Sequence, residues 1–431
     1  MRPASSAGLL LALAAGVSPA TGQATSDRVP AGRVPSPAAA VHEDLEQNRY
    51  HLGPIRLFPF VQIDNAGYNN NVFGTASGKV ADETADISAG ARLLIPVGSK
   101  VFLRGLAAPE YIWYNHLSEG RAFGGNYEAQ FLALFNHLTL DADGRDSRTA
   151  SLLNAETLRT VLSTTRSARV RGEIDVAGPL SFFGEGEKAE YRYEANPIPD
   201  QPLEDPAILD RREDRARGGF RLHAREETSF SLAAEVVRTR FDDPAQGGDN
   251  RSEAILLGVV IDRPKVYFDL SAGYRDSKPI DGSRFRELRT PTGSYFASYL
   301  LRSSVEIFVN GFRGAEYSVS ESNPYYVATS NGGGVNLRFG SRFTVRAYGD
   351  YAENRYPIAS ASDGGIRRTD TIGTFGGGFQ VSLGRRLVLG VFGTEYRYDS
   401  NVPGVARNIF RLTSLISFQL SPIVSIRGGL S

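Results

Sequence analysis

Residues 342–351 read RFTVRAYGDY, and apolar or small side chains occupy every second position of this stretch. The positions between them are polar and include Arg346 and Asp350. Successive side chains of a β-strand point to opposite faces, so the stretch predicts a strand with one apolar face and one aqueous face. Similar stretches recur from Ile55 onward, and we count about eighteen of them, between about 16 and 20.

The connections between these stretches are alternately short and long. Breaks at 97–99 and 178–179 are tight, whereas those at 69–83, 145–165 and 242–250 are much longer. A barrel of the bacterial outer membrane has tight turns at its periplasmic rim and long loops at its outer rim. We therefore predict that residues 55–431 form an all-β domain, a transmembrane antiparallel up-and-down β-barrel.

Two soluble architectures also use alternating strands. A two-sheet sandwich has no reason to alternate its turn lengths so regularly. A propeller would show a recurring signature about every forty residues, and the sequence has none. Both alternatives are therefore weaker than the barrel.

The N-terminal segment has the features of a secretory signal. Arg2 supplies a positive start, Leu9 to Val17 is a short apolar core, and small residues follow it. We assign residues 1–24 to a signal peptide that directs secretion, and the predicted barrel indicates the bacterial outer membrane as the location of the mature chain. Residues 25–54 contain four prolines and no apolar period, so they predict a flexible periplasmic lead-in.

The composition argues against several classes of function. Lys plus Arg and Asp plus Glu number 48 each, which leaves no net field to attract nucleic acid. Cysteine is absent and there are only five histidines, so we expect no metal centre, no cofactor and no enzyme activity. Calcium binding by the acidic stretch 242–249 is the alternative that stays open. The longest apolar runs, such as 256–261, are far too short for a membrane helix.

Charged residues share the polar face of several predicted strands. An ionised side chain that faces lipid at mid-depth costs about 2 to 4 kcal/mol, so these charges should face the lumen. There they could guide a charged, hydroxylated solute, or simply pair with one another and fill the lumen. The candidate lumen-lining residues are Arg169, Arg171, Glu173, Asp175, Lys188, Glu190, Arg192, Arg215, Arg217, Arg221, Arg346, Asp350, Glu395 and Arg397.

Aromatic residues lie at the loop ends of predicted strands. Tyr and Trp are enriched where a membrane meets water, so these residues predict an interfacial girdle. Its candidate members are Tyr111, Trp113, Tyr191, Tyr193, Tyr396 and Tyr398.

Three stretches carry a resemblance to a known family. They are LFPF at 57–60 with GYNNNVF at 67–73, EYIWY at 110–114, and EYRYDSNVPG at 395–404. With them the chain resembles the outer-membrane β-barrel porin type 2 family. The resemblance implies an outer-membrane barrel, often associated with secretion of polysaccharide, and no catalytic residues. At the C-terminus the chain departs from that pattern, because it continues past Leu420 as either an extra strand or a truncated end.

These observations predict passage of a solute across the outer membrane, and the resemblance implies exported exopolysaccharide as that solute. The expected partners are outer-membrane lipid, the barrel-assembly machinery and polysaccharide export proteins. Two alternatives stay open. One is a general diffusion porin, and the other is a plugged structural or surface-binding barrel that transports nothing.

Overall fold

The computed structural model describes most of the chain. The described residues are 37–47, 50–194, 205–225, 227–243, 246–280, 282–320, 322–360, 363–384 and 386–420. The predicted signal peptide and the segment after Leu420 lie outside these residues.

Nearly all of the regular structure consists of long β-strands. The first half contains α1 (Pro37–Gln47), β1 (Tyr50–Leu52), β2 (Ile55–Asn69), β3 (Asp82–Val97), β4 (Val101–Tyr114), η1 (Ser118–Gly120), β5 (Ala122–Leu134), β6 (Leu138–Leu152), β7 (Thr160–Ala177), β8 (Leu180–Glu194), η2 (Pro206–Leu209) and β9 (Arg211–Arg225). The second half contains β10 (Thr228–Phe241), β11 (Asn250–Asp262), β12 (Val266–Pro279), β13 (Leu288–Arg302), β14 (Val305–Tyr317), β15 (Tyr325–Phe339), β16 (Phe343–Ser360), β17 (Ile366–Leu383), β18 (Leu387–Ser400) and β19 (Arg407–Gln419).

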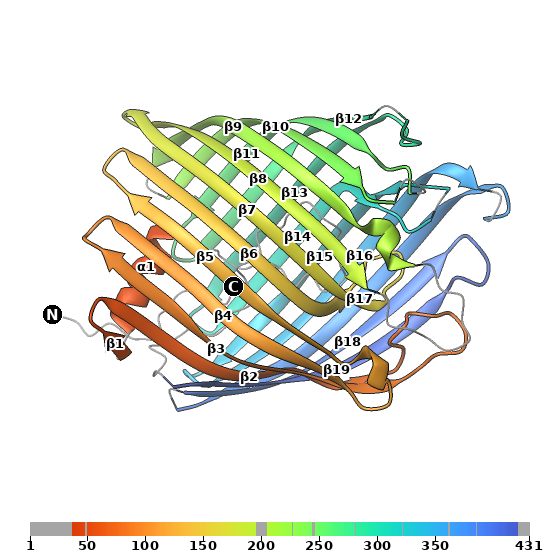
Figure 1. Cartoon of the computed structure of the whole chain (residues 1–431), viewed down its shortest axis with the longest axis horizontal. Helices are drawn as coiled ribbons and strands as arrows, with labels where there is room; N and C mark the ends of the chain where they lie inside the picture. The colour runs from red at the N-terminus through yellow and green to blue at the C-terminus, as the bar shows by residue number, and fades with distance from the viewer. Residues whose placement is uncertain are drawn as a thin grey trace.

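The strands β2 to β19 close into a single barrel of eighteen (Figure 1). Each strand pairs antiparallel with the next, and β19 returns to pair with β2. The short β1 extends the sheet only beside the start of β2. Closure removes every free sheet edge, which a membrane requires because hydrocarbon cannot satisfy unpaired backbone groups. The predicted up-and-down barrel of about eighteen strands is confirmed.

The two rims of the barrel differ as the sequence indicates. Tight turns join the strands at the rim where the N-terminal helix lies, and the longer connections gather at the other rim (Figure 1). The turn between β3 and β4 uses Gly98 at a φ of 73°, a left-handed conformation that glycine adopts without a Cβ clash. We call the two ends the turn rim and the loop rim.

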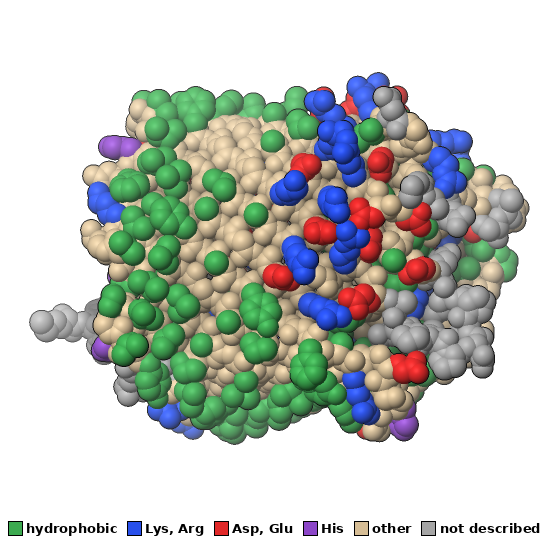
Figure 2. Space-filling model, viewed as in Figure 1, with side chains coloured by type: hydrophobic (Ala, Val, Ile, Leu, Met, Phe, Trp, Pro, Cys, Tyr) green, Lys and Arg blue, Asp and Glu red, His purple; other side chains and the backbone are tan. Residues whose placement is uncertain are grey.

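The exterior of the barrel is apolar over much of its height. Outward residues such as Val170, Ile174, Ile255 and Leu257 are between 48% and 64% exposed. In Figure 2 such side chains cover the surface toward the turn rim, whereas charged side chains form a band toward the loop rim. Exposed apolar surface of this extent is stable against hydrocarbon rather than water. Across the part of the chain that the structure covers, no helix is long and apolar enough to cross a bilayer.

The interpretation of residues 25–54 as a flexible lead-in was wrong for its last part. Residues 37–47 form the helix α1, which lies in the opening at the turn rim (Figure 1). Val41 is only 2% exposed, because it packs in a cluster with the lumen-facing Phe58, Leu94 and Leu132. This apolar contact holds the helix inside the barrel.

Ion pairs anchor the same helix to the barrel wall. Asp44 on α1 lies 3.5 Å from Arg92 on β3 and 2.9 Å from Arg104 on β4. Arg56 on β2 donates a hydrogen bond to the backbone carbonyl of Leu45. The helix therefore narrows the turn-rim opening through contacts with three neighbouring strands.

The seam where β19 meets β2 leaves no room for a side chain at Gly67. A Cβ there would lie 1.7 Å from the carbonyl oxygen of Leu412. We expect the variant G67A to lose most of its closed barrel, because the backbone of the two strands would have to separate. The measurement is the fraction of heat-modifiable folded protein on a detergent gel. Gly184 on β8 has no atom within 4 Å of that position, so G184A is the control and should close normally. A fully closed G67A barrel would contradict the seam geometry.

Candidate functional site

Most of the predicted lumen-lining residues face the interior of the barrel. Their strand neighbours at alternate positions, such as Val170 and Phe220, are exposed on the outside, which fixes the direction of the others. The inward residues are Arg169, Arg171, Glu173 and Asp175 on β7, Arg215, Arg217 and Arg221 on β9, and Arg346 and Asp350 on β16.

Five predicted lumen residues point outward instead, so their assignment was wrong. They are Lys188, Glu190 and Arg192 on β8, and Glu395 and Arg397 on β18. Each lies near the loop rim, where the strand has passed beyond the apolar part of the exterior. A charge costs little on the outside at that height, so charge alone no longer indicates direction.

Four of the six predicted girdle residues point inward, and their assignment was also wrong. Tyr191, Tyr193, Tyr396 and Tyr398 are buried inside the barrel near the loop rim. Tyr191 packs against the guanidinium group of Arg211, which lies 4.1 Å from the ring centroid. These residues alternate with the misassigned charges on the same two strands, so one error caused the other.

The remaining two girdle candidates do face outward. Tyr111 and Trp113 alternate on β4 with Ile112, which is buried in the interior. Tyr111 contacts Phe123 on the outer surface, with ring centroids 4.9 Å apart. Their interfacial role stays a prediction.

The wall formed by β6 to β9 carries a network of charges. Arg221 lies 2.7 Å from Glu173, two strands away, and Arg215 lies 3.1 Å from Glu187 on the adjacent strand. Arg169 lies 2.5 Å from Asp143 on β6. These ion pairs run along the wall rather than across the lumen, so they line the passage without filling it.

Two guanidinium groups of the lumen differ from this pattern. Among the described residues, Arg217 and Arg346 have no carboxylate within ion-pair distance, and the Nε atom of each is buried without a hydrogen-bond acceptor. Arg217 lies 5.9 Å from the centroid of the Phe183 ring, and Arg346 lies 5.1 Å from that of Phe308. Both side chains are therefore held on aromatic rings with positive charge left for a solute.

The tip of the hairpin between β6 and β7 crosses the loop-rim mouth. We call residues 152–162 the mouth segment, and nearly all of its residues are buried. Leu153 packs with Tyr191 on β8, whereas Leu158 packs with Ile372 on β17. In a ring of eighteen strands, β8 and β17 are nine strands apart and hence on opposite walls. The mouth segment therefore spans the barrel from wall to wall, although the sequence had predicted an outward loop over 145–165.

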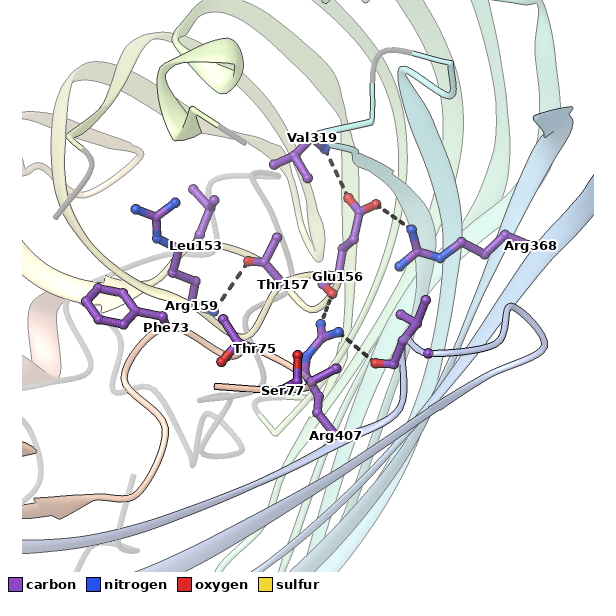
Figure 3. Close-up of a pocket in the computed structure, with 14 residues that line it drawn as sticks. Phe73, Thr75, Ser77, Leu153, Glu156, Thr157, Arg159, Val319, Arg368 and Arg407 are labelled. Atoms are coloured by element: carbon purple, nitrogen blue, oxygen red, sulfur yellow. Dashed lines mark hydrogen bonds and ion pairs between the residues drawn. The ribbon is translucent and has the colours of Figure 1, made fainter. Parts of the chain in front are cut away.

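Glu156 holds this segment in place. Its carboxylate accepts hydrogen bonds from the Ser318 hydroxyl at 2.9 Å and from the Val319 backbone N–H at 3.0 Å. The guanidinium group of Arg368 on β17 lies 3.4 Å from the same carboxylate, and Arg407 on β19 donates to the Glu156 backbone carbonyl (Figure 3). Burial raises the pKa of Glu156 above its ordinary value, while Arg368 and the hydrogen-bond donors oppose that shift.

A cavity of about 390 Å³ opens beside this network. Arg159, Arg368 and Arg407 contribute guanidinium groups to its lining, together with the hydroxyl groups of Thr75 and Thr157. Figure 3 shows these side chains arranged around Glu156, the single carboxylate among the described residues of the lining. The excess of cationic and hydroxyl groups suits a small, polar, negatively charged molecule.

The acidic stretch 242–249 does not form a cation site in the described residues. The carboxylate of Asp242 forms an ion pair with Arg192, and that of Asp249 accepts the backbone N–H of Phe241. In the same residues no group of three or more carboxylate, imidazole or thiol ligands could hold a metal ion.

Solved structures of bacterial outer-membrane proteins share this fold. OccK2 (OpdF) of Pseudomonas aeruginosa, solved in complex with glucuronate, is 12% identical, with a TM-score of 0.51 over 86% of this chain and 100% of that one. A BenF-like porin of Pseudomonas fluorescens Pf-5 is 12% identical, with a TM-score of 0.50 over 86% and 100%. The outer membrane protein opdK of Pseudomonas aeruginosa is 11% identical, with the same TM-score and the same coverage.

The chain has the fold of outer-membrane porins. Together with the apolar exterior, this fold locates the protein in the outer membrane, as predicted. No protein-family model and no curated protein sequence matches the chain. The barrel that the resemblance noted above implies is confirmed by the fold, whereas the association with polysaccharide has no counterpart in these structures.

Proposed function

We propose that the protein is an outer-membrane channel for small hydrophilic solutes that carry a negative charge. The observation that carries this proposal is the pair of lumen arginines, Arg217 and Arg346, that lack a carboxylate partner among the described residues. A guanidinium group binds a carboxylate through two parallel hydrogen bonds, and a passage needs such sites to be weak and repeated. The cationic cavity at the mouth adds a first binding step at the outer end of the same route.

Carboxylates of sugar acids fit this chemistry. The structure of OccK2 contains glucuronate, which combines a carboxylate with several hydroxyl groups. The mouth cavity of the present protein offers both guanidinium and hydroxyl groups, as such a molecule requires. This supports sugar acids or similar small carboxylates as the solute class.

Export of a polysaccharide, the solute that the resemblance implies, is less well supported. The mouth segment 152–162 is bound to opposite walls of the barrel, so a polymer chain would have to displace it. A small solute needs much less room than a polymer, and the cavity of about 390 Å³ beside the segment matches its size. We therefore favour a channel for small solutes over a polysaccharide exporter.

The charge preference of the channel tests the proposal. We expect the double variant R217A/R346A to lower the anion-to-cation permeability ratio at least about threefold, because two unpaired positive charges leave the lumen. The measurement is the reversal potential in planar bilayers under a salt gradient. R397A is the control, because Arg397 faces outward and pairs with Glu395. An unchanged ratio in the double variant would remove both arginines from the permeation path.

A second arm of the same experiment identifies the solute class. Glucuronate added to the chamber should reduce the potassium chloride current of the wild type, and glucose at the same concentration should reduce it much less. Equal block by both sugars would indicate a general diffusion porin. Absence of any current in the wild type would indicate a plugged barrel without transport.

A further inference from the structure

Charged side chains gather on the outside of the barrel near the loop rim. Figure 2 shows them as a band next to the apolar part of the exterior. Among these charged residues are four outward arginines on three neighbouring strands, which we call the exterior arginine cluster. Its members are Arg212 on β9, Arg238 and Arg240 on β10, and Arg251 on β11.

The strand register places these like charges directly opposite one another. Arg240 pairs in register with Arg212, and Arg238 pairs in register with Arg251. Side chains of directly opposed residues lie close together, and like charges in that position destabilise a sheet. An anion that binds between them would remove this repulsion.

Carboxylates nearby compensate only part of the charge. Arg251 pairs with Glu253 at 2.9 Å, and Arg212 lies 3.9 Å from Glu190, which also binds Arg192. Within the described residues, neither Arg238 nor Arg240 forms an ion pair or a hydrogen bond, although both are exposed.

Asp214 on β9 is the carboxylate closest in register to this unpaired charge. It lies opposite Arg238, and it is within ion-pair distance of Lys188, at 3.9 Å. The cluster therefore retains unpaired positive charge on an outward surface.

The height of the cluster indicates what it meets. On β10 the next outward residue from Arg238 toward the turn rim is Val236, about 7 Å away along the strand. On β11 the exposed Ile255 is the second outward residue from Arg251 toward the turn rim. The guanidinium groups thus lie just beyond the edge of the hydrocarbon, at the level of the lipid headgroups of the outer leaflet.

We propose that the exterior arginine cluster binds the phosphate groups of a phosphorylated lipid in the outer leaflet. Arginine donates two parallel hydrogen bonds to a phosphate group. The pair Arg212 and Arg240 could therefore bind one phosphate group, and the pair Arg238 and Arg251 could bind a second. The apolar residues directly below would contact the acyl chains of the same lipid. This site lies outside the channel and does not depend on the proposed transport function.

The test compares lipid binding by matched variants of the full-length mature protein in detergent. The probe is lipid A with two phosphate groups, and bound lipid is measured by native mass spectrometry. We expect R238Q/R240Q to bind it at least about tenfold more weakly than the wild type, because the loss of one charged contact alone corresponds to about tenfold. The control is R355Q/R397Q, because both arginines face outward but pair with Glu353 and Glu395.

Further arms separate the possible outcomes. Lipid A without phosphate should bind the wild type as weakly as it binds the variant, and inorganic phosphate should not compete at equal concentration. Equal lipid binding by wild type and R238Q/R240Q would overturn the proposal, as would equal loss in the control. A change in oligomeric state with unchanged lipid binding would show a protein interface instead. Channel conductance reports on transport separately, so failure here leaves the proposed function untouched.

Discussion

An E156A variant is expected to conduct several-fold more current than the wild type. Glu156 connects the mouth segment to Val319 on one side and to Arg368 on the other, and its side chain is only 3% exposed. Asp370, 2.9 Å from Arg368, keeps that guanidinium group paired, so E156A loses one ion pair and the hydrogen bonds from Ser318 and Val319, together about 3 kcal/mol. That loss shifts the equilibrium of the mouth segment about a hundredfold from the docked toward the released state. Release of the segment widens the opening at the loop rim. The measurement is single-channel conductance in planar bilayers.

Two further variants make this result specific. E156Q keeps an acceptor for the backbone N–H of Val319 but loses the charge that faces Arg368, so its conductance should lie between wild type and E156A. E395A removes an outward carboxylate whose partner, Arg397, is solvent-exposed, and it should conduct like the wild type. Wild-type conductance in E156A would mean that the mouth segment does not limit the current.

The period of two predicted the barrel well because it reports a property of every strand. Each crossing segment must present one face to hydrocarbon, so residues such as Val170 and Ile174 repeat the same choice many times. Errors arose where that requirement ends. On β8, Phe182 is exposed outward and Phe183 is buried inward. Alternation that continues from this pair along β8 places Lys188 on the outside. We had placed it in the lumen because it is charged.

The mouth segment could not be placed from sequence. Leu152, Leu153 and Leu158 are apolar residues within a predicted loop, and this was the only sign that the loop is buried. Their partners come from strands far away in the chain, so no local pattern names them. Glu156 was missed for the same reason, because its partners are Arg368 and the segment that contains Ser318.

The sequence of α1 does contain features that favour a helix, but we interpreted the prolines of residues 25–54 as evidence for a flexible segment. Pro37 is the first residue of α1, a position where proline is favoured because its missing N–H would be unpaired anyway. Three alanines follow it, and alanine is the strongest helix former. Which barrel wall the helix meets depends on Arg92 and Arg104, and these residues are informative only once the barrel is closed.

Release of this helix is expected to raise the conductance from the opposite end of the channel. In the variant D44K a third positive charge replaces the carboxylate that binds Arg92 and Arg104, so repulsion should expel α1 from the turn-rim opening. We expect a conductance increase of at most about 1.5-fold, because a several-fold increase in E156A leaves the helix only the smaller part of the total resistance. Ala38 lies at an exposed position of the same helix, so A38K is the control that adds the charge without the repulsion.

The helix and the mouth segment lie at opposite rims, so they restrict the current in series. Resistances in series add, and the larger one conceals the effect of removing the smaller. The combined variant E156A/D44K should therefore conduct more than the two separate increases predict when they are summed. If D44K conducts like the wild type and E156A/D44K conducts like E156A, α1 does not restrict the passage. If D44K conducts like the wild type but E156A/D44K conducts more than E156A, the mouth segment is the dominant resistance and the helix is the second one.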